Sequence, residues 1–357
     1  MDATTTVVGA SPRLSPVRVR DYASSDAPRW EAFVDGSESA TFFHRIGWRT
    51  LIEAEFRHRT HYLVAERGER IVGVLPLAEI RSRLFGHSLS SLPFAVYGGP
   101  VADDEEATDA LIDAAVERAT ALEVDHLELR NRAPLRPEWP RQDLYVTFRR
   151  ALDPDPERNM LAIPRKQRAM VRKGIKNGLV AQVDPTPERF FALYTDNMHR
   201  HGTPAFRRRY FDRLCEVFGN ACETLIVLDA DARPVSGVMS FYFRDEVLPY
   251  YAGDNPRARD LAANDFKYWA LMGRALERGA RMFDYGRSKR DSGSFAFKKN
   301  WGFEPAPLAY EYRLVRAQAI PQNNPANPKY QAMISLWRRM PRRLVVALGP
   351  HLVRNLG

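Results

Sequence analysis

The sequence predicts an α+β protein in which one structural unit occurs twice in tandem. Each half of the chain follows the order strand, helix pair, antiparallel hairpin, helix, strand. The second strand of each hairpin carries a similar run, Ile-Val-Gly-Val at 71–74 and Val-Ser-Gly-Val at 235–238. The 357 residues, 45% of them apolar, are enough for two domains of ordinary size.

Each unit is expected to form a mixed, mostly antiparallel sheet flanked by helices. In the first unit we expect a strand at 17–20, helices at 28–34 and 47–55, hairpin strands at 61–65 and 71–77, a helix at 107–122 and a strand at 126–130. In the second unit we expect a strand at 179–183, helices at 187–199 and 204–218, hairpin strands at 223–228 and 235–243, a strand at 247–252, a helix at 261–279 and a strand at 282–285.

A basic helix is expected between the units, because Pro164 suits a helix start and Gly178 suits a helix end. Its cations recur every three or four residues and form one positive stripe, made of Arg165, Arg168, Arg172 and Lys176. The predicted segments are a disordered N-terminus at 1–16, the first unit at 17–158, the basic linker helix at 159–178, the second unit with the main substrate cleft at 179–317, and a linker with a basic amphipathic tail at 318–357.

The net charge of +9 is concentrated in two places. Residues 160–178 hold six Lys or Arg and no acid, and residues 312–357 hold eight more and no acid. Such segments attract phosphate on nucleic acid, on a nucleotide-linked precursor or on an anionic membrane, unless they are only solvated faces.

The tail mixes Trp337 and aliphatic residues with arginines, as one or two short helices broken at Pro341 and Pro350. This pattern is typical of a helix that lies on an anionic membrane surface, although packing against the body is the alternative. No run of 18 apolar residues and no signal peptide is present, and there are only two cysteines. We therefore expect a cytoplasmic protein, peripheral on the inner face of the membrane.

Several motifs, taken in order, resemble the FemAB-like family. The first unit contains Phe-His-Arg-Ile-Gly-Trp at 43–48 and Tyr-Gly-Gly-Pro-Val at 97–101. The second unit closes with Phe-Asp-Tyr-Gly-Arg at 283–287 and Phe-Lys-Lys-Asn-Trp-Gly-Phe at 297–303. The resemblance covers roughly residues 17–316, and the motifs are most similar to a bacterial branch associated with exopolysaccharide and PEP-CTERM/exosortase systems.

The resemblance implies two tandem GNAT-like domains. Fem transferases take an aminoacyl group from charged tRNA and attach it to a peptidoglycan precursor amine, whereas other GNAT proteins use acyl-CoA. Fem aminoacyltransferases commonly carry Arg-Gly-Pro where this chain has Gly98-Gly99-Pro100. Residues 255–264 also lack the glycines of a CoA pyrophosphate loop. We expect no tightly bound cofactor and a donor that is aminoacyl-tRNA or acyl-CoA, the first being favoured.

Three residues are expected to carry the chemistry. Lys298, which matches the family's Phe-Lys pair, would hold a phosphate or the developing oxyanion, or else is a surface lysine beside Lys299. Asp284 would orient or deprotonate the acceptor amine, or else caps a turn. Of Tyr250 and Tyr251 on the central strand, one should face the cleft because strand neighbours alternate, and Tyr251 is placed in the catalytic set.

The expected substrate-binding residues carry positive charge or lie at helix starts, and no metal site is expected. They are Arg287, Lys289, Asn264, Arg168, Arg172, Lys176, His44 and Trp48. For Asn264 helix capping is the alternative, for His44 and Trp48 a packed pair, and for the linker stripe a solvated connector.

We therefore expect an acyltransferase that moves an aminoacyl or acyl group to an amine of a cell-envelope or exopolysaccharide-related precursor. Positioning and oxyanion stabilisation would drive it, because no GxSxG elbow or Cys–His signature points to a covalent intermediate. The alternatives are an acyl-CoA-dependent GNAT N-acyltransferase and a non-catalytic membrane-surface assembly factor. A purely nucleic-acid-binding protein is disfavoured, because no RRM, KH or helix-turn-helix signature is found.

Overall fold

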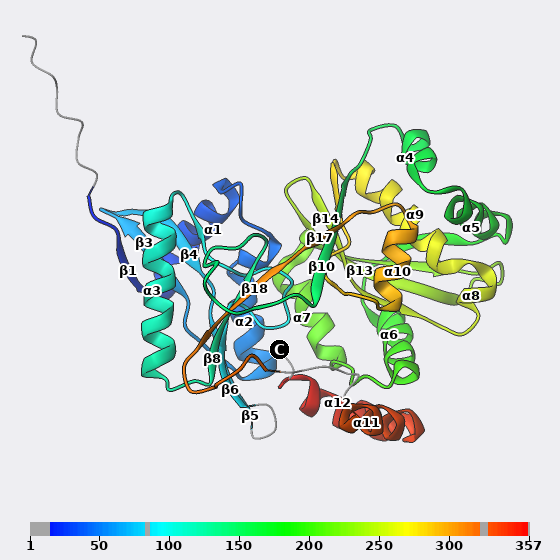
Figure 1. The fold of residues 1–357 in the computed structure, drawn as a ribbon. Helices are drawn as coiled ribbons and strands as arrows, with labels where there is room; N and C mark the ends of the chain where they lie inside the picture. Colours follow the sequence, from blue (N-terminus) through cyan, green and yellow to red (C-terminus); the bar gives the residue numbers. More distant parts are fainter. Residues whose placement is uncertain (1–14, 83–85, 322–327, 356–357) are drawn as a thin grey trace, which may run out of the picture.

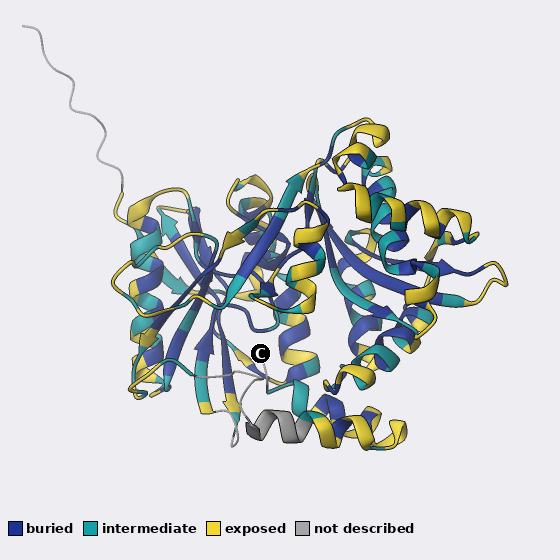
Figure 2. Cartoon of the chain, turned by 45° about the vertical axis from the view of Figure 1, so that its right-hand side comes forward, coloured by how far each residue is buried: buried dark blue, intermediate teal, exposed yellow. Residues whose placement is uncertain are grey.

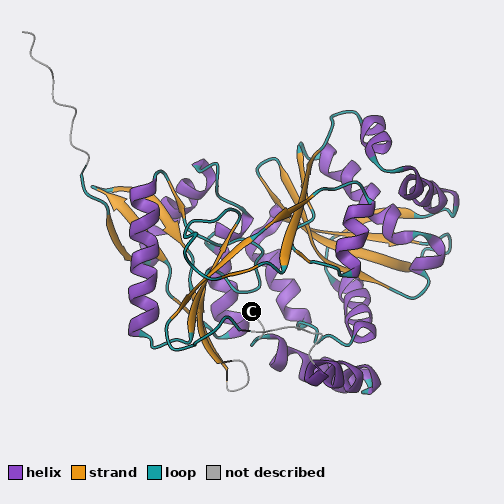
Figure 3. Cartoon of the chain, viewed as in Figure 1, coloured by secondary structure: helices purple, strands orange, loops and turns teal. Residues whose placement is uncertain are grey.

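The computed structural model describes residues 15–82, 86–321 and 328–355, and it confirms an α+β chain with two lobes (Figure 1). Helices cover the sheets of both lobes, as Figure 3 shows. Residues 1–14 of the segment expected to be disordered lie outside the described residues.

In the first lobe the described residues form two sheets and three α-helices. A four-stranded antiparallel sheet has the order β1 (Arg18–Asp21), β3 (Leu63–Arg67), β4 (Arg70–Leu75) and β7 (Val101–Ala102). A six-stranded sheet has the order β2 (Arg59–Thr60), β5 (Ala78–Ser82), β6 (Gly86–Ser90), β8 (His126–Asn131), β18 (Ala309–Leu314) and β9 (Arg141–Gln142). The helices are α1 (Ala27–Gly36), α2 (Gly47–Leu51) and α3 (Glu105–Ala121), and one π-helical turn, Ile52–Phe56, extends α2.

The second lobe is built on one eight-stranded sheet. Its order is β11 (Val180–Asp184), β12 (Cys222–Leu228), β13 (Pro234–Phe243), β14 (Glu246–Asp254), β15 (Met282–Asp284), β10 (Tyr145–Ala151) and β16 (Ser288–Lys289), and β17 (Pro305–Pro307) also pairs with β10. The helices are α4 (Pro156–Ala162), α5 (Arg165–Lys176), α6 (Glu188–His201), α7 (Arg208–Phe218), α8 (Ala258–Leu261), α9 (Ala263–Glu277) and α10 (Gly293–Asn300). The expected hairpins at 61–77 and 223–243 are present as β3–β4 and β12–β13.

Two strands are exchanged between the lobes. β10 precedes the basic helix in the chain, yet it pairs with β15, β16 and β17 of the second lobe. β18 follows the second unit, yet it lies between β8 and β9 of the first lobe. Neither strand was predicted from the sequence. The boundary drawn at residue 158 therefore divides the chain but does not separate the sheets of one lobe from the sheet of the other.

The lobes also share a hydrophobic core. Phe42 from the first unit stacks on Phe241 of β13 with ring centroids 4.4 Å apart, and it contacts Phe218 of α7 at 4.6 Å. Trp30 and Trp48 lie in the same cluster and are fully buried. Burial of this apolar surface fixes one lobe against the other, and Figure 2 shows the buried strands meeting between them.

The C-terminal tail forms α11 (Pro328–Arg339) and α12 (Arg342–Val353), while residues 322–327 and 356–357 lie outside the described part. The helices separate at Pro341 as expected. The expected break at Pro350 is wrong, because Pro350 lies inside α12. Proline fixes φ at a value that a helix tolerates, and Gly349 and Pro350 are both buried there, so packing holds the helix through the proline.

Candidate functional site

A cavity opens in the second lobe where two parallel strands diverge. β14 and β15 pair through only two residue pairs, Glu246 with Met282 and Val247 with Phe283. Beyond this point a cavity of about 410 Å³ lies against β14, the turn after β15, α9 and α10. We call it the aromatic cavity, because six of its lining side chains are aromatic: Phe94, Phe206, Tyr250, Tyr251, Tyr268 and Tyr285.

A β-bulge shapes one wall of this cavity. The register between β13 and β14 shifts so that Met239 faces Tyr251 while Ser240 faces Pro249, which leaves Tyr250 as an extra residue. Simple alternation predicted that only one of Tyr250 and Tyr251 would face the cleft. The bulge interrupts that alternation, and both tyrosines line the aromatic cavity.

Lys298 lies at the inner side of α10 and lines the aromatic cavity. Ser292 caps this helix by accepting a hydrogen bond from the backbone N–H of Phe295. The Lys298 side chain is only 8% exposed, and its ammonium donates to three successive carbonyls, those of Tyr285 at 2.7 Å, Gly286 at 3.1 Å and Arg287 at 3.2 Å. Burial lowers the pKa of Lys298 to about 7, against the opposing effect of the Asp284 charge.

Asp284 does not line the aromatic cavity; it holds the turn that carries those carbonyls. Its Oδ1 accepts from the backbone N–H of Gly286 at 2.7 Å, and its Oδ2 accepts from the Tyr97 hydroxyl at 2.9 Å. Arg149 of β10 forms an ion pair with Asp284 at 3.1 Å. Asp284 is 1% exposed, and these contacts hold its carboxylate against the turn after β15.

Arg287 lines the aromatic cavity and is exposed. Its guanidinium lies over the Tyr145 ring, 4.4 Å from the centroid. Lys289 pairs in β16 with Tyr145 and does not line that cavity. The Tyr251 hydroxyl bonds to the Tyr210 hydroxyl at 2.8 Å, and burial raises the pKa of Tyr251 well above 10.

The basic helix α5 packs against the start of α9. The Cβ that an alanine would place at Gly174 would lie 2.8 Å from Phe266 Cβ, and the Asn177 amide donates to the carbonyl of Leu261. Arg172 and Lys176 are exposed on this helix, whereas Arg168 donates to the carbonyls of Leu161 and Ile163. Gly174 faces α9, so Arg172 and Lys176, two residues to either side of it, lie on the outer, solvent-facing side of α5.

Asn264 is in the first turn of α9, where it is half-buried. Ala262 before it adopts a left-handed conformation with φ of 58°. Tyr268, one turn further along α9, lines the aromatic cavity. The start of α9 is therefore close to the cavity wall although Asn264 itself does not line it.

His44 and Trp48 lie in the first lobe. Trp48 is fully buried, and its indole N–H donates to the carbonyl of Phe42. The His44 Nε2 bonds to the carbonyl of Gly99 at 2.9 Å, and its Nδ1 lies 3.0 Å from the backbone N–H of Thr41, so the neutral Nε2–H tautomer fits both partners. Burial lowers the pKa of His44 to about 4.

His44 lines a second cavity, the first-unit cavity, of about 210 Å³. It follows the parallel pair β6–β8, as the aromatic cavity follows β14–β15. A Cβ at Gly98 would lie 2.3 Å from the carbonyl of Ser91, and one at Gly99 would lie 1.8 Å from Asn131 Oδ1. The arginine that Fem transferases carry at Gly98 would therefore not fit this backbone.

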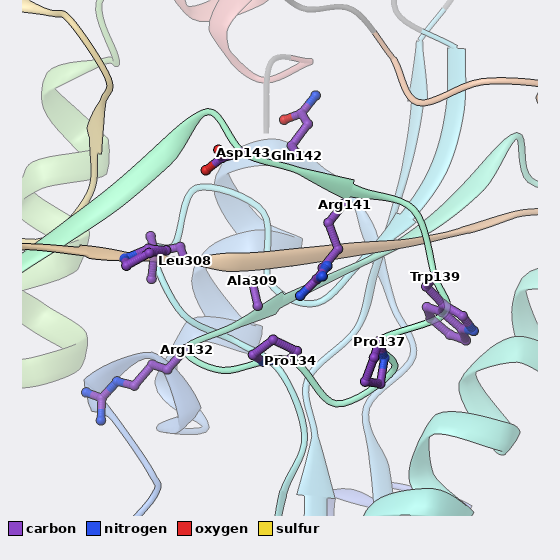
Figure 4. Close-up of a pocket in the computed structure, with 10 residues that line it drawn as sticks. Arg132, Pro134, Pro137, Trp139, Arg141, Gln142, Asp143, Leu308 and Ala309 are labelled. Atoms are coloured by element: carbon purple, nitrogen blue, oxygen red, sulfur yellow. The ribbon is translucent and has the colours of Figure 1, made fainter.

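A third, open groove of about 560 Å³ lies on the first lobe beside β18. Figure 4 shows the residues that line it, among them Arg132, Trp139 and Arg141. None of the predicted site residues lines it. The described residues contain no cluster of three or more His, Cys, Asp or Glu side chains suited to a metal ion.

Sequence reasoning missed Phe94 and Phe206 as cavity residues. Phe94 belongs to the first unit and Phe206 precedes α7, so no local pattern links them to β14. Tyr285 and Tyr268 were also missed, although Tyr285 stands inside the motif at 283–287. That motif is the signal in the sequence that could have identified Tyr285.

Comparisons with known proteins agree with this architecture. Residues 165–299 match the family model described as an acetyltransferase (GNAT) domain. FemX superposes with a TM-score of 0.62 at 16% identity, over 89% of this chain and 100% of FemX. The C-terminal domain of a protein assigned as a lysylphosphatidylglycerol synthetase in Agrobacterium fabrum gives 0.57 at 14% identity, over 80% and 92%.

A tandem GNAT protein from the clavulanic acid biosynthesis pathway, solved without acetyl-CoA, gives a TM-score of 0.53 at 15% identity, over 83% of this chain and 97% of that one. No curated protein sequence matches the chain. The expectation of two tandem GNAT-like domains is confirmed by these structures, and the matched family model falls on the half that holds the aromatic cavity.

Proposed function

We propose that this protein is an acyltransferase that moves an acyl or aminoacyl group from an activated donor to an amine. The observation that carries the proposal is Lys298, a buried cation on the wall of a cavity formed by diverging parallel strands. It lies in the half of the chain that matches a GNAT domain model. A cation held in a site of low dielectric stabilises negative charge more strongly than the same cation in water.

The proposed reaction needs no covalent intermediate. The acceptor nitrogen attacks the carbonyl carbon of the ester or thioester, and the carbonyl oxygen becomes an anion. As this anion collapses, the bond to the leaving oxygen or sulfur breaks, and the proton that the nitrogen loses passes to that leaving atom, directly or through water. Lys298 and Arg287 supply positive charge for this anion, while the aromatic walls exclude water and hold the acyl group. Positioning of this kind is worth about 7–11 kcal/mol in well-oriented reactions.

We propose aminoacyl-tRNA as the donor. The α9 N-terminus offers one site for donor phosphate, and Arg172 and Lys176, exposed on the outer side of α5, offer a second. The same end of α9 has a left-handed Ala262 where a CoA-binding loop would use glycine. An acyl-CoA donor is the second candidate, because the chain shares its fold with a tandem GNAT protein and matches an acetyltransferase model.

We propose an amine of a cell-envelope precursor as the acceptor. The similarity to FemX supports the fold on which such an acceptor would bind. The finer placement among exopolysaccharide and exosortase systems rests on the sequence motifs alone. A non-catalytic assembly factor remains the alternative of another class, and it would tolerate loss of Lys298.

The decisive test measures binding and transfer with the purified chain. Bulk charged tRNA, uncharged tRNA, acetyl-CoA and longer acyl-CoAs are compared over a salt series, and transfer to a panel of peptide and amino-sugar amines is followed. Preference for charged over uncharged tRNA supports the proposed donor. Preference for acyl-CoA, with only salt-sensitive background for tRNA, assigns the protein to the CoA-dependent class. Transfer that is unchanged in Lys298→Met contradicts the proposed role of Lys298.

A further inference from the structure

The two tail helices are fastened to the body along one side. Trp337 of α11 and Val345 of α12 are buried, at 7% and 0% exposure. The imidazole of His199 bonds to the carbonyl of Met340 at 3.1 Å, and that of His58 bonds to the carbonyl of Arg354 at 2.7 Å. α11 and α12 both contact α6, and Figure 1 places them together along the lower edge of the molecule.

The other side of the same helices exposes large aliphatic side chains. The described residues include eight exposed large apolar side chains, and half of them are in the tail: Leu336, Leu344, Val346 and Leu348. Leu336 is 64% exposed and Leu344 is 50% exposed. Leu344 and Leu348 are four residues apart, so they lie on one face of α12. A helix that only packed against the body would turn these side chains inward.

The same segment is strongly cationic. Arg339, Arg342 and Arg343 are exposed, and within the described residues none of the three forms an ion pair. Arg338 is also exposed, but it donates a hydrogen bond to the carbonyl of His201 on the body. Residues 312–357 contain no acid. No described helix is long and apolar enough to cross a membrane. The tail thus combines an anchored inner side with an outer side of leucines and free arginines.

We propose that the outer side of α11 and α12 docks on an anionic lipid surface. Aliphatic side chains that enter the interface and arginines that meet acidic headgroups are the two features that such a surface recognises. Nucleic acid would use the arginines, but it gives no reason for four exposed aliphatic residues. The proposal does not depend on the transfer activity, because it names a surface outside the aromatic cavity.

Docking would also set the orientation of that cavity. Phe206 lines the aromatic cavity and also a small cavity together with Pro350 and Val353 of α12. The tail is therefore anchored beside one wall of the aromatic cavity. A chain held at a bilayer through α11 and α12 has this wall close to the lipid surface.

The test is co-sedimentation of the full chain with vesicles of phosphatidylcholine alone or with about 30 mol% phosphatidylglycerol, at low and physiological salt. The tail variant is Leu344→Ser/Arg339→Gln/Arg343→Gln. Its matched control is Ile175→Ser/Arg172→Gln/Lys176→Gln on α5, which also removes one aliphatic side chain of 50% exposure and two exposed cations. Circular dichroism and binding of charged tRNA are measured for both variants.

We expect the wild-type chain to bind the anionic vesicles at least tenfold more tightly than the neutral ones, and the tail variant to lose at least tenfold. The α5 variant should stay within twofold of wild type on vesicles. The proposal is overturned if wild type does not bind, if both variants lose binding equally, or if only the α5 variant does. It is also overturned if the tail variant changes self-association or tRNA binding while vesicle binding persists.

Discussion

The two cavities follow the same strand arrangement but are filled in opposite ways. In the first lobe the chain beyond β6 closes on β8, because Gly98 and Gly99 bring the backbone within contact distance of Ser91 and Asn131. In the second lobe the space beyond β14 and β15 stays open and is lined by aromatic rings. The duplicated fold has thus kept one open cavity of this kind and filled most of the other with its own backbone.

The two cavities also differ in the pKa of the ionisable side chain that lines each of them. His44 is held by Thr41 and Gly99, and its lowered pKa of about 4 keeps it neutral near pH 7. Lys298 has a pKa of about 7, so its charge changes in the range where an enzyme works. We therefore expect the chemistry of the proposed transfer in the second lobe. Four predictions test the difference between the two lobes.

The largest expected effect is the loss of transfer in Lys298→Met. Removal of one charge-stabilising group should lower kcat about 100-fold or more, as for the loss of one oxyanion-hole donor. Lys299→Met is the matched control, because Lys299 is the exposed neighbour on the same helix. His44→Gln, which keeps a donor for Gly99, should lower kcat less than about tenfold. Equal losses in Lys298→Met and His44→Gln would remove the distinction between the lobes.

The second effect is on stability in acid. Unfolding returns His44 to a pKa of about 6.5, so between pH 6.5 and 4 the unfolded chain binds the additional proton. The free energy of unfolding should therefore fall as pH falls through this window, by roughly 3 kcal/mol from this group. Denaturant unfolding of wild type and His44→Gln at several pH values measures the difference. A variant with the same acid dependence as wild type would show that His44 does not remain neutral in the folded chain.

The third effect is the alkaline limb of the activity profile. If the cationic form of Lys298 stabilises the oxyanion, kcat should fall above pH 7, by about tenfold per pH unit. Lys298→Arg keeps its charge at every accessible pH, so its profile should be flat in the same range. Measurement of kcat from about pH 6 to 9 for both proteins tests this. A limb that persists in Lys298→Arg must come from another group.

The smallest expected effect is that of Tyr251→Phe. The Tyr251 hydroxyl bonds to the Tyr210 hydroxyl. Within the described residues it forms no hydrogen bond to Lys298 or Arg287. Its removal should cost about 1 kcal/mol of stability and only a few-fold in kcat, since a neutral hydrogen bond is worth that much. Thermal unfolding and steady-state kinetics measure both. A loss as large as that of Lys298→Met would make Tyr251 part of the chemistry.

The sequence was informative where the signal is local. The hairpins at 61–77 and 223–243 and the basic helix at 165–176 follow from short-range patterns, and the structure has them. The bulge at Tyr250 was not predictable, because it depends on the register with β13. The partners of Asp284 were not predictable for a similar reason: Tyr97 and Arg149 are far away in the chain.

Three of the residues predicted to form the site, Lys298, Tyr251 and Arg287, line the aromatic cavity together. The other expected ligands are distributed over the α9 start, the basic helix and the first lobe. Only long-range packing decides which charged residues share a cavity, and one sequence holds no record of that packing.

The exchange of β10 and β18 determines when each lobe can complete its folding during synthesis. β8 is finished at residue 131, but β18, its neighbour in the sheet, is made only when residue 314 is reached. At about 5–20 residues per second, one edge of the first lobe's larger sheet stays unpaired for about 10–40 seconds during synthesis. The first lobe therefore cannot finish folding before nearly all of the second has left the ribosome, and the two lobes mature as one cooperative body.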